Sequence, residues 1–241
     1  MPTLVRGETS IYYEVSGEGF PLLLLAPGGM RSNIALWQRS PFHPIRELSS
    51  KFCVIAMDQR NAGQSRAGIE ASDGWATYMN DHLALLDELG IARCHVLGMC
   101  IGSAFCLSLA VHAPERITAA VLEQPIGLTE TNREVFFQMF DGWAEEIAAA
   151  RPEVSRAALS SFRNNLYGTD FAFSVTRDQV KRCQVPLLVL RGNDVYHPAE
   201  ICEEIARLAP DAALIQSWKE GDAVSRAAAR VTEFLQAHTP G

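Results

Sequence analysis

Short apolar runs that alternate with segments of helical periodicity place the strongest constraint on the fold of this chain. Such continuous runs are typical of strands buried on both faces of a sheet. Helical spacing of apolar residues recurs from Trp75 to Leu89 and again near the C-terminus. Strands and helices in this order predict an α/β fold with a mostly parallel sheet and helices on both faces. The runs lie at residues 21–26, 53–57, 94–97, 117–122 and 187–190, and the later helical segments at 198–208 and 224–236.

Length and composition favour a single domain over residues 1–241. The chain has 241 residues, 48% of them hydrophobic, which is enough for one large core. Its net charge of -7, without a block rich in Lys and Arg, argues against nucleic acid as a partner. The apolar runs are too short to span a bilayer and the N-terminus lacks a signal-peptide core, so we expect a cytoplasmic protein with no membrane partner. The six cysteines lack paired metal-ligand spacing, which predicts free thiols and no metal site.

One long segment, from about residue 126 to residue 183, interrupts the alternation. It carries Phe136, Phe137, Met139, Phe140 and Trp143 at helical spacing but no convincing strand. A structureless loop of this length is improbable inside a compact domain. The segment is therefore predicted to be a helical cap insertion over the ends of the strands.

A cysteine stands at a tight junction between a strand and a helix. The segment Gly98–Gly102 has the pattern Gly-x-Cys-x-Gly and joins the run 94–97 to a helix that begins near Ser103. The glycines let the two backbones approach closely, and the turn lifts the central side chain out at the N-terminus of the helix. Amide dipoles at that terminus favour a thiolate. Cys100 is therefore the candidate nucleophile; the alternative role is a small buried apolar side chain.

The order of elements, the Gly98–Gly102 turn and a polar turn at residues 58–65 together resemble the α/β-hydrolase superfamily. The polar turn is similar to the family pattern Asp-x-Arg-Gly-x-Gly-x-Ser and departs from it at Asn61. The resemblance covers nearly the whole chain and implies a backbone oxyanion hole. In this sequence the hole would comprise the N–H of Ile101 and one from Gly29 or Met30.

The resemblance also implies an acid and a histidine. Asp194, just after the run 187–190, is the favoured acid, and Glu123, at the end of the run 117–122, is the alternative. The histidine departs from the family pattern, because Asp222 stands where the family has Gly-His before the last helix. His197 follows Asp194 by three residues and is the candidate base, since a thiol needs a weaker base than a hydroxyl. His43, in a Pro-Phe-His-Pro loop, is held in reserve.

The sequence is compatible with three functions. The favoured one is a cofactor-independent hydrolase of a small ester, thioester or lactone, in which Cys100 forms an acyl-enzyme that water releases. The second is a catalytically degenerate protein that keeps the pocket and binds a ligand. The third is a lyase or decarboxylase whose oxyanion hole stabilises an enolate. Each implies a small-molecule partner, and a homodimer is left open.

Overall fold

The computed structural model describes residues 2–241 of the chain. The strands are β1 Thr3–Arg6, β2 Thr9–Ser16, β3 Phe20–Leu25, β4 Phe52–Met57, β5 Cys94–Met99, β6 Ile117–Glu123, β7 Leu187–Leu190 and β8 Ala212–Ile215. The α-helices are α1 Pro44–Leu48, α2 Trp75–Glu88, α3 Ile101–His112, α4 Arg133–Ala150, α5 Arg156–Tyr167, α6 Arg177–Lys181, α7 Ala199–Leu208 and α8 Asp222–Ala237. Two short 3-10 helices, η1 Gly29–Arg31 and η2 Ile34–Arg39, follow β3.

All of these strands belong to one sheet, in the order β1-β2-β4-β3-β5-β6-β7-β8. β2 pairs antiparallel with β1 and with β4, whereas the pairs from β4 through to β8 are parallel. The segment Leu22–Leu25 is fully buried between β4 and β5, because a central parallel strand has no face toward water. The predicted α/β fold with a mostly parallel sheet is confirmed.

The apolar patterns do not predict β1. Only Leu4 of this strand is buried, and β1 pairs with β2 alone at the edge of the sheet. A strand with one buried residue carries neither a continuous apolar run nor the alternation of a half-buried strand.

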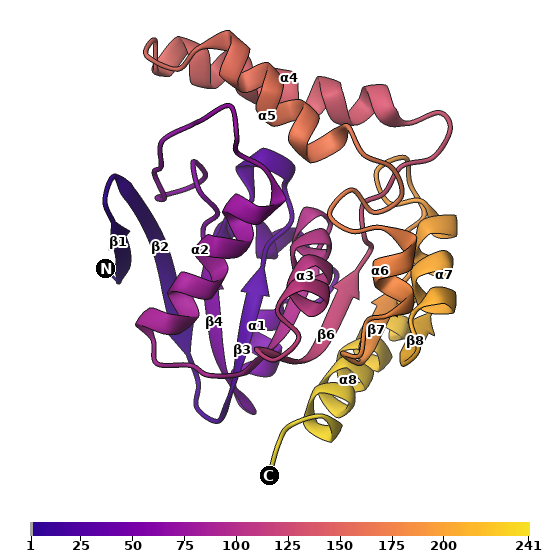
Figure 1. Cartoon of the computed structure of the whole chain (residues 1–241). Helices are drawn as coiled ribbons and strands as arrows, with labels where there is room; N and C mark the ends of the chain where they lie inside the picture. Colours follow the sequence, from indigo (N-terminus) through magenta and orange to yellow (C-terminus); the bar gives the residue numbers. More distant parts are fainter. Residues whose placement is uncertain (1) are drawn as a thin grey trace.

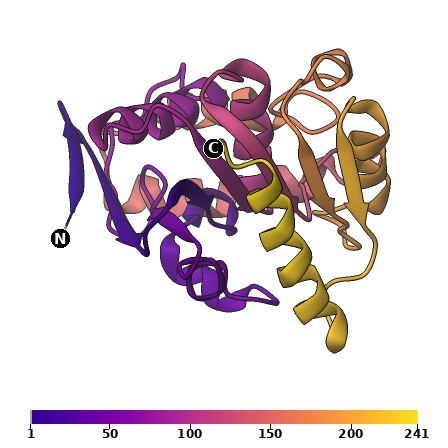
Figure 2. The ribbon, with the colours of Figure 1, turned by 90° about the horizontal axis from the view of Figure 1, so that it is seen from below.

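Helices cover both faces of the sheet and give the molecule two apolar cores. Figure 2 shows α2 and α3 on one side of the sheet, with α1 and the yellow α8 on the other. The first core includes Phe105 of α3, Leu85 of α2 and Ile205 of α7. The second includes Trp37 of η2 and Val231 of α8. Among the described residues, no helix combines the length and apolar character needed to cross a membrane.

The segment between β6 and β7 contains α4, α5 and α6. Here α4 and α5 are termed the cap helices, because they cross the carboxyl ends of the parallel strands (Figure 1). Phe140 of α4 and Phe162 of α5 are almost fully buried against each other, with ring centroids 5.3 Å apart. The indole N–H of Trp75 donates to the Leu166 carbonyl oxygen at 2.9 Å and so joins α2 to the end of α5. The aromatic spacing in this segment therefore reflects packing between the cap helices and the sheet domain.

Candidate active site

Cys100 occupies the sharp turn between β5 and α3. Its backbone has φ 60° and ψ -121°, a conformation that residues other than glycine rarely adopt. The turn is held from beneath, because the N–H of Cys100 donates to the Glu123 carbonyl oxygen at 3.0 Å. The hydroxyl oxygen of Ser103 lies 2.8 Å from this oxygen and 2.6 Å from the Gly98 carbonyl oxygen, so its single proton can be donated to either. These bonds offset the strain and place the thiol at the N-terminus of α3.

Asp194 and His197 form a pair within the loop between β7 and α7. The His197 Nδ1 atom lies 2.8 Å from the Asp194 carboxylate, which also accepts the N–H groups of Tyr196 at 3.0 Å and His197 at 3.1 Å. Because a carboxylate can only accept, Nδ1 carries a proton and Nε2 is the atom left to act on a neighbour. The Asn132 side-chain amide braces the loop by donating to the Val195 carbonyl oxygen at 2.8 Å.

His197 brings its second ring nitrogen into the pocket that Cys100 also lines. Nε2 is buried and meets no described residue in hydrogen-bonding geometry, yet the two side chains are close enough to shift each other's ionisation. The Cys100 thiol and the His197 imidazole are therefore neighbours that act on each other's ionisation. Cys100, His197 and Asp194, in this order, are brought together at one end of the sheet.

The pKa values of these groups favour a charged pair. Burial raises the pKa of the Cys100 thiol, but His197 and the backbone N–H groups of Gly28 and Ile101 outweigh burial and bring it below its ordinary value. Burial lowers the pKa of His197, but Asp194 and Cys100 overcome this and raise it to about 9. The hydrogen bond from His197 lowers the pKa of Asp194 to about 2. Both shifts therefore act in the direction of a thiolate beside an imidazolium.

The loop after β3 also borders the thiol. Gly28 and Gly29 have φ values of 119° and 58° and line the pocket with Cys100 and Ile101. Of the residues expected to supply an oxyanion hole, Ile101 and Gly29 line the pocket, whereas Met30 does not. The N–H of Gly28, which the sequence does not single out, also acts on the thiol.

The polar turn at residues 58–65 braces this loop. The Asp58 carboxylate accepts the N–H of Ile34 at 2.8 Å and that of Gln64 at 2.7 Å. Asn61, where the family pattern has glycine, has φ 59°. Asparagine is among the few other residues that tolerate this conformation, so the departure from the pattern leaves the turn intact.

The pocket around Cys100 is small and lies beneath the cap helices. Its volume is about 170 Å³. Phe136 and Met139 of α4 and Tyr167 of α5 enclose it from above, and Ile126 and Tyr196 complete the wall. The sequence marks the helical spacing of Phe136 and Met139, but it gives no sign that Tyr167 or Tyr196 joins them, because these residues come from separate elements.

Glu123, the alternative acid, does not pair with His197. Its side chain is fully buried, both carboxyl oxygens lack a hydrogen-bond partner, and burial raises its pKa to about 8. The carboxyl is therefore mostly protonated at neutral pH, and Asp194 is the acid that the geometry brings to the imidazole. Asp222, at the place of the family's histidine, is exposed at the start of α8 and does not line the pocket.

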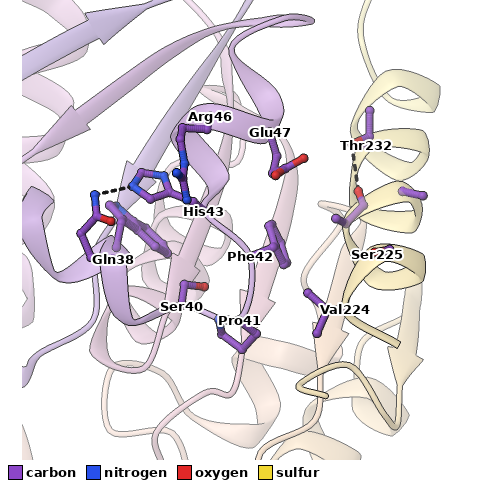
Figure 3. A pocket seen from close by; sticks show the side chains of 13 residues that line it. Gln38, Ser40, Pro41, Phe42, His43, Arg46, Glu47, Val224, Ser225 and Thr232 are labelled. Carbon is purple, nitrogen blue, oxygen red and sulfur yellow. Dashed lines mark hydrogen bonds between the residues drawn. The ribbon is translucent and has the colours of Figure 1, made fainter. Parts of the chain in front are cut away.

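His43, the reserve histidine, lies in a different pocket. Figure 3 shows it beside Gln38 and Ser40, across a cavity of about 450 Å³ from Val224 and Thr232 of α8. The histidines in α2 and β5 are also engaged elsewhere: His82 bonds Gln59 at 2.8 Å, and His95 bonds Thr239 at 2.9 Å. Among the described residues, no cluster of three or more His, Cys, Asp and Glu side chains is suited to hold a metal ion.

Comparison with known proteins identifies the family. The profile of the alpha/beta hydrolase fold family matches residues 21–213. This range includes the Gly98–Gly102 turn around Cys100, termed the elbow, as well as the polar turn and the segment of the cap helices. The chain belongs to the α/β-hydrolase fold family. The resemblance predicted from the elbow and the polar turn is thereby confirmed at the level of the superfamily.

Curated relatives within this family carry several hydrolase names. The provisionally named carbamate hydrolase RutD of Azorhizobium caulinodans is 33% identical over 123 residues, which are 51% of this chain and 43% of that protein. Carboxylesterase YbfK of Bacillus subtilis is 25% identical over 222 residues, covering 79% of this chain and 70% of that protein. The chain spans less than half the length of the relatives that it matches at above 30% identity.

Solved α/β-hydrolase structures superpose on the whole chain. A meta-cleavage product hydrolase from Pseudomonas fluorescens has a TM-score of 0.74 at 20% identity and covers 99% of this chain and 98% of its own. The enol-lactonase from Burkholderia xenovorans has a TM-score of 0.70 at 21% identity, over 98% of this chain and all of its own. At these identities the likeness concerns the fold.

Proposed function

We propose that this chain is a cofactor-independent hydrolase of a carboxylic ester, thioester or lactone, with Cys100 as its nucleophile. The observation that carries the proposal is the series Asp194, His197 and Cys100 in one pocket at the end of the sheet. An acid that holds an imidazole, which in turn faces a nucleophile, is the arrangement that acyl transfer requires. The hydrolase names of the curated relatives support the same reaction class.

Acylation uses the charged pair directly. The Cys100 thiolate attacks the carbonyl carbon, and the electron pair of the C=O bond moves to the oxygen. The N–H groups of Ile101 and Gly29 donate to this oxyanion. As the tetrahedral intermediate collapses, the bond to the leaving group breaks and the imidazolium of His197 donates its Nε2 proton to that group. The products of this half-reaction are an alcohol or thiol and a thioester on Cys100.

Deacylation reverses the role of the histidine. Neutral His197 accepts a proton from water at Nε2 while the water oxygen attacks the thioester carbon. Collapse of the second tetrahedral intermediate breaks the C–S bond and returns the thiolate beside an imidazolium. Asp194 keeps Nδ1 protonated in both half-reactions, so Nε2 is always the atom that exchanges protons with substrate and water.

The buried histidine favours a hydrolase over a ligand-binding protein without chemistry. Holding an imidazole with a pKa of about 9 in a mostly buried position requires Asp194 and Cys100 to outweigh desolvation. A pocket that only bound an apolar ligand would gain nothing from this charge. The arrangement therefore argues for a working nucleophile.

The test is acyl transfer to a single cysteine. Wild-type protein mixed with p-nitrophenyl butyrate should release p-nitrophenol and gain one butyryl group on Cys100, detected by peptide mass spectrometry. Cys100→Ala should lower turnover by roughly a thousandfold or more, because no other group can form the acyl-enzyme. Cys100→Ser should also be poor, because a serine hydroxyl is much less acidic than a thiol and depends far more on a positioned base.

Cys53 provides the matched control. It is partly exposed on β4, does not line the pocket, and its change to Ala should leave both turnover and labelling unaltered. Unchanged turnover in Cys100→Ala, or acylation of Cys53 in place of Cys100, would remove Cys100 from the mechanism.

A further inference from the structure

The size of the pocket limits the acyl group that Cys100 can carry. A volume of about 170 Å³ is close to that of an apolar cavity that holds one benzene molecule, roughly 150 Å³. The loop and the cap close the space on both sides. A Cβ atom at Gly29 would lie 2.6 Å from the Met139 sulfur, so α4 already touches the loop after β3.

Aromatic rings form the far wall and are held by one another. Phe136 stacks on Tyr167 with centroids 5.5 Å apart and meets Tyr196 edge to face at 5.6 Å. Phe173 meets both Phe136 and Tyr167 edge to face, at 4.7 and 5.3 Å. Phe136 and Tyr167 are at most 1% exposed, so neither ring can move aside without disturbing the core of the cap. The wall is therefore rigid and suits a flat apolar group.

Among the described residues, His197 is the only cationic side chain that lines the pocket, and it faces the Cys100 thiolate. Arg31, on the loop after β3, makes two hydrogen bonds to Glu146, and Arg133 donates to the carbonyl oxygens of Tyr167 and Thr169. Asp194 is engaged by His197. A carboxylate on the acyl group would be desolvated with no cation beside it except His197, and the Cys100 thiolate that already faces His197 would repel it.

We infer that the substrate's acyl group is uncharged, apolar and about the size of a benzene ring, and that it lies between Cys100 and the wall formed by Phe136, Met139 and Tyr167. This inference rests on the proposed function, since it takes the acyl group to be bound at Cys100. It deepens that function from esters in general to benzoyl-sized neutral acyl groups.

The experiment compares p-nitrophenyl esters that differ only in the acyl group. Benzoate, acetate, octanoate and hemisuccinate are each measured for kcat/KM, and each value is divided by the rate of hydroxide hydrolysis of the same ester. Benzoate should exceed acetate and octanoate by at least about tenfold. It should exceed hemisuccinate by at least about a hundredfold, because the carboxylate is repelled by the Cys100 thiolate and finds no cation other than the His197 imidazolium that faces it. Met139→Ala should shift the preference toward octanoate by enlarging the space beside Gly29.

A binding assay separates the two proposals. The assay measures how far each amide protects Cys100 from alkylation by iodoacetamide. Benzamide should protect the thiol, whereas succinamate and octanamide should not, so the assay reports the same preference without acyl transfer. Equal rates for all four esters, with Cys100 acylated, would overturn the inference while the hydrolase function stands. If no ester acylates Cys100 but benzamide still protects it, the proposed hydrolase function is overturned. The pocket would then still bind a benzene-sized group, but the preference could no longer be one for acyl groups. Protection by succinamate equal to that by benzamide would overturn the neutral, benzene-sized pocket itself.

Discussion

His197 titrates in contact with two groups that both favour its charged form. Asp194 and Cys100 raise its pKa to about 9, and His197 in turn brings the pKa of Cys100 below its ordinary value. The charged pair therefore exists at pH values above the lowered pKa of the thiol and below about 9. Above this range the imidazolium loses the proton needed by the leaving group, and below it the thiolate takes up a proton.

The pH dependence of Cys100 alkylation measures this pair. In the wild-type protein the iodoacetamide rate should stay high well below the ordinary thiol pKa of about 8.5. His197→Ala should raise the pKa of Cys100, because burial then dominates, and should slow alkylation at pH 7 by roughly tenfold or more. His112→Ala, at an exposed position at the end of α3, is the control and should change nothing. An ordinary thiol profile that is unaffected by His197→Ala would show that no such pair forms.

Glu123 makes a different pH-dependent contribution. Its carboxyl has a pKa of about 8 in the folded protein, above the ordinary value of 4.5, because it is buried without a hydrogen-bond partner. A raised pKa means that the folded state holds this proton more tightly than the unfolded state. The associated stability is complete below about pH 4.5 and is lost as the pH rises through about 8.

Glu123→Gln should remove this component. Between pH 5 and pH 8.5 the thermal unfolding midpoint of the wild-type protein should fall more steeply than that of the variant. The measurement is thermal unfolding followed by circular dichroism at several pH values. Parallel pH profiles for the two proteins would mean that the carboxyl finds a partner in solution.

The junction of β5, α3 and β3 depends on close approach between backbones. A Cβ atom at Gly102 would overlap the carbonyl oxygen of Leu25 in β3, and one at Gly98 would overlap the carbonyl oxygen of Gly102. Neither neighbour can give way, since both are backbone atoms in or beside the centre of the sheet. These two glycines therefore determine how closely α3 packs on the sheet and where the thiol emerges.

Two glycine substitutions should have opposite effects on stability. Gly102→Ala should lower the free energy of unfolding by at least about 3 kcal/mol, because the helix must move away from β3. Gly142 lies in the middle of α4, and a Cβ atom there would meet no atom within 4 Å. Gly142→Ala should therefore raise the free energy of unfolding by about 1 kcal/mol, because alanine has a higher helix propensity than glycine. Urea unfolding of both variants is the measurement. A stable Gly102→Ala variant would contradict the packing described at the elbow.

At the scale of the whole molecule, the cap helices separate the reacting groups from water. Trp75 of α2 and Asn165 of α5 show how the cap is attached: the indole donates to the Leu166 carbonyl oxygen, and the Asn165 amide donates to the Ala71 and Asp73 carbonyl oxygens. The bidentate contact of Arg31 with Glu146 attaches the other end of the cap to the loop after β3. The pocket is therefore formed jointly by the sheet domain and the cap.

Replacing residues 130–168 by a short Gly-Ser linker should open this pocket. The variant should bind a hydrophobic dye, because apolar side chains that α4 and α5 cover become exposed. Iodoacetamide should reach Cys100 faster, whereas the preference among acyl groups should disappear with Phe136 and Tyr167. Wild-type selectivity in this variant would place the acyl group outside the cap.

The sequence alone was sufficient for the fold class and for the position of Cys100. Central strands such as β3 are buried on both faces, so continuous apolar runs in the sequence indicate them. The elbow requires glycines at fixed spacing from the central residue. Both signals are local. β1 escapes prediction because a strand with one buried residue, Leu4, leaves no such signal. Asp194 and His197 could be proposed as a pair because they share one short loop.

Tertiary structure decided which side chains meet across distant segments. Nothing local shows that Tyr167 and Met139 close the same pocket as Cys100, or that Met30 does not line it, because these contacts depend on how the cap helices lie over the sheet. Protonation states were decided in the same way. Glu123 ends the buried strand β6 and Asp194 lies in the loop after β7, but Glu123 is enclosed without a partner and Asp194 bonds an imidazole, so their pKa values move in opposite directions. Burial and partners are properties of the folded chain, and no local pattern of residue types specifies them.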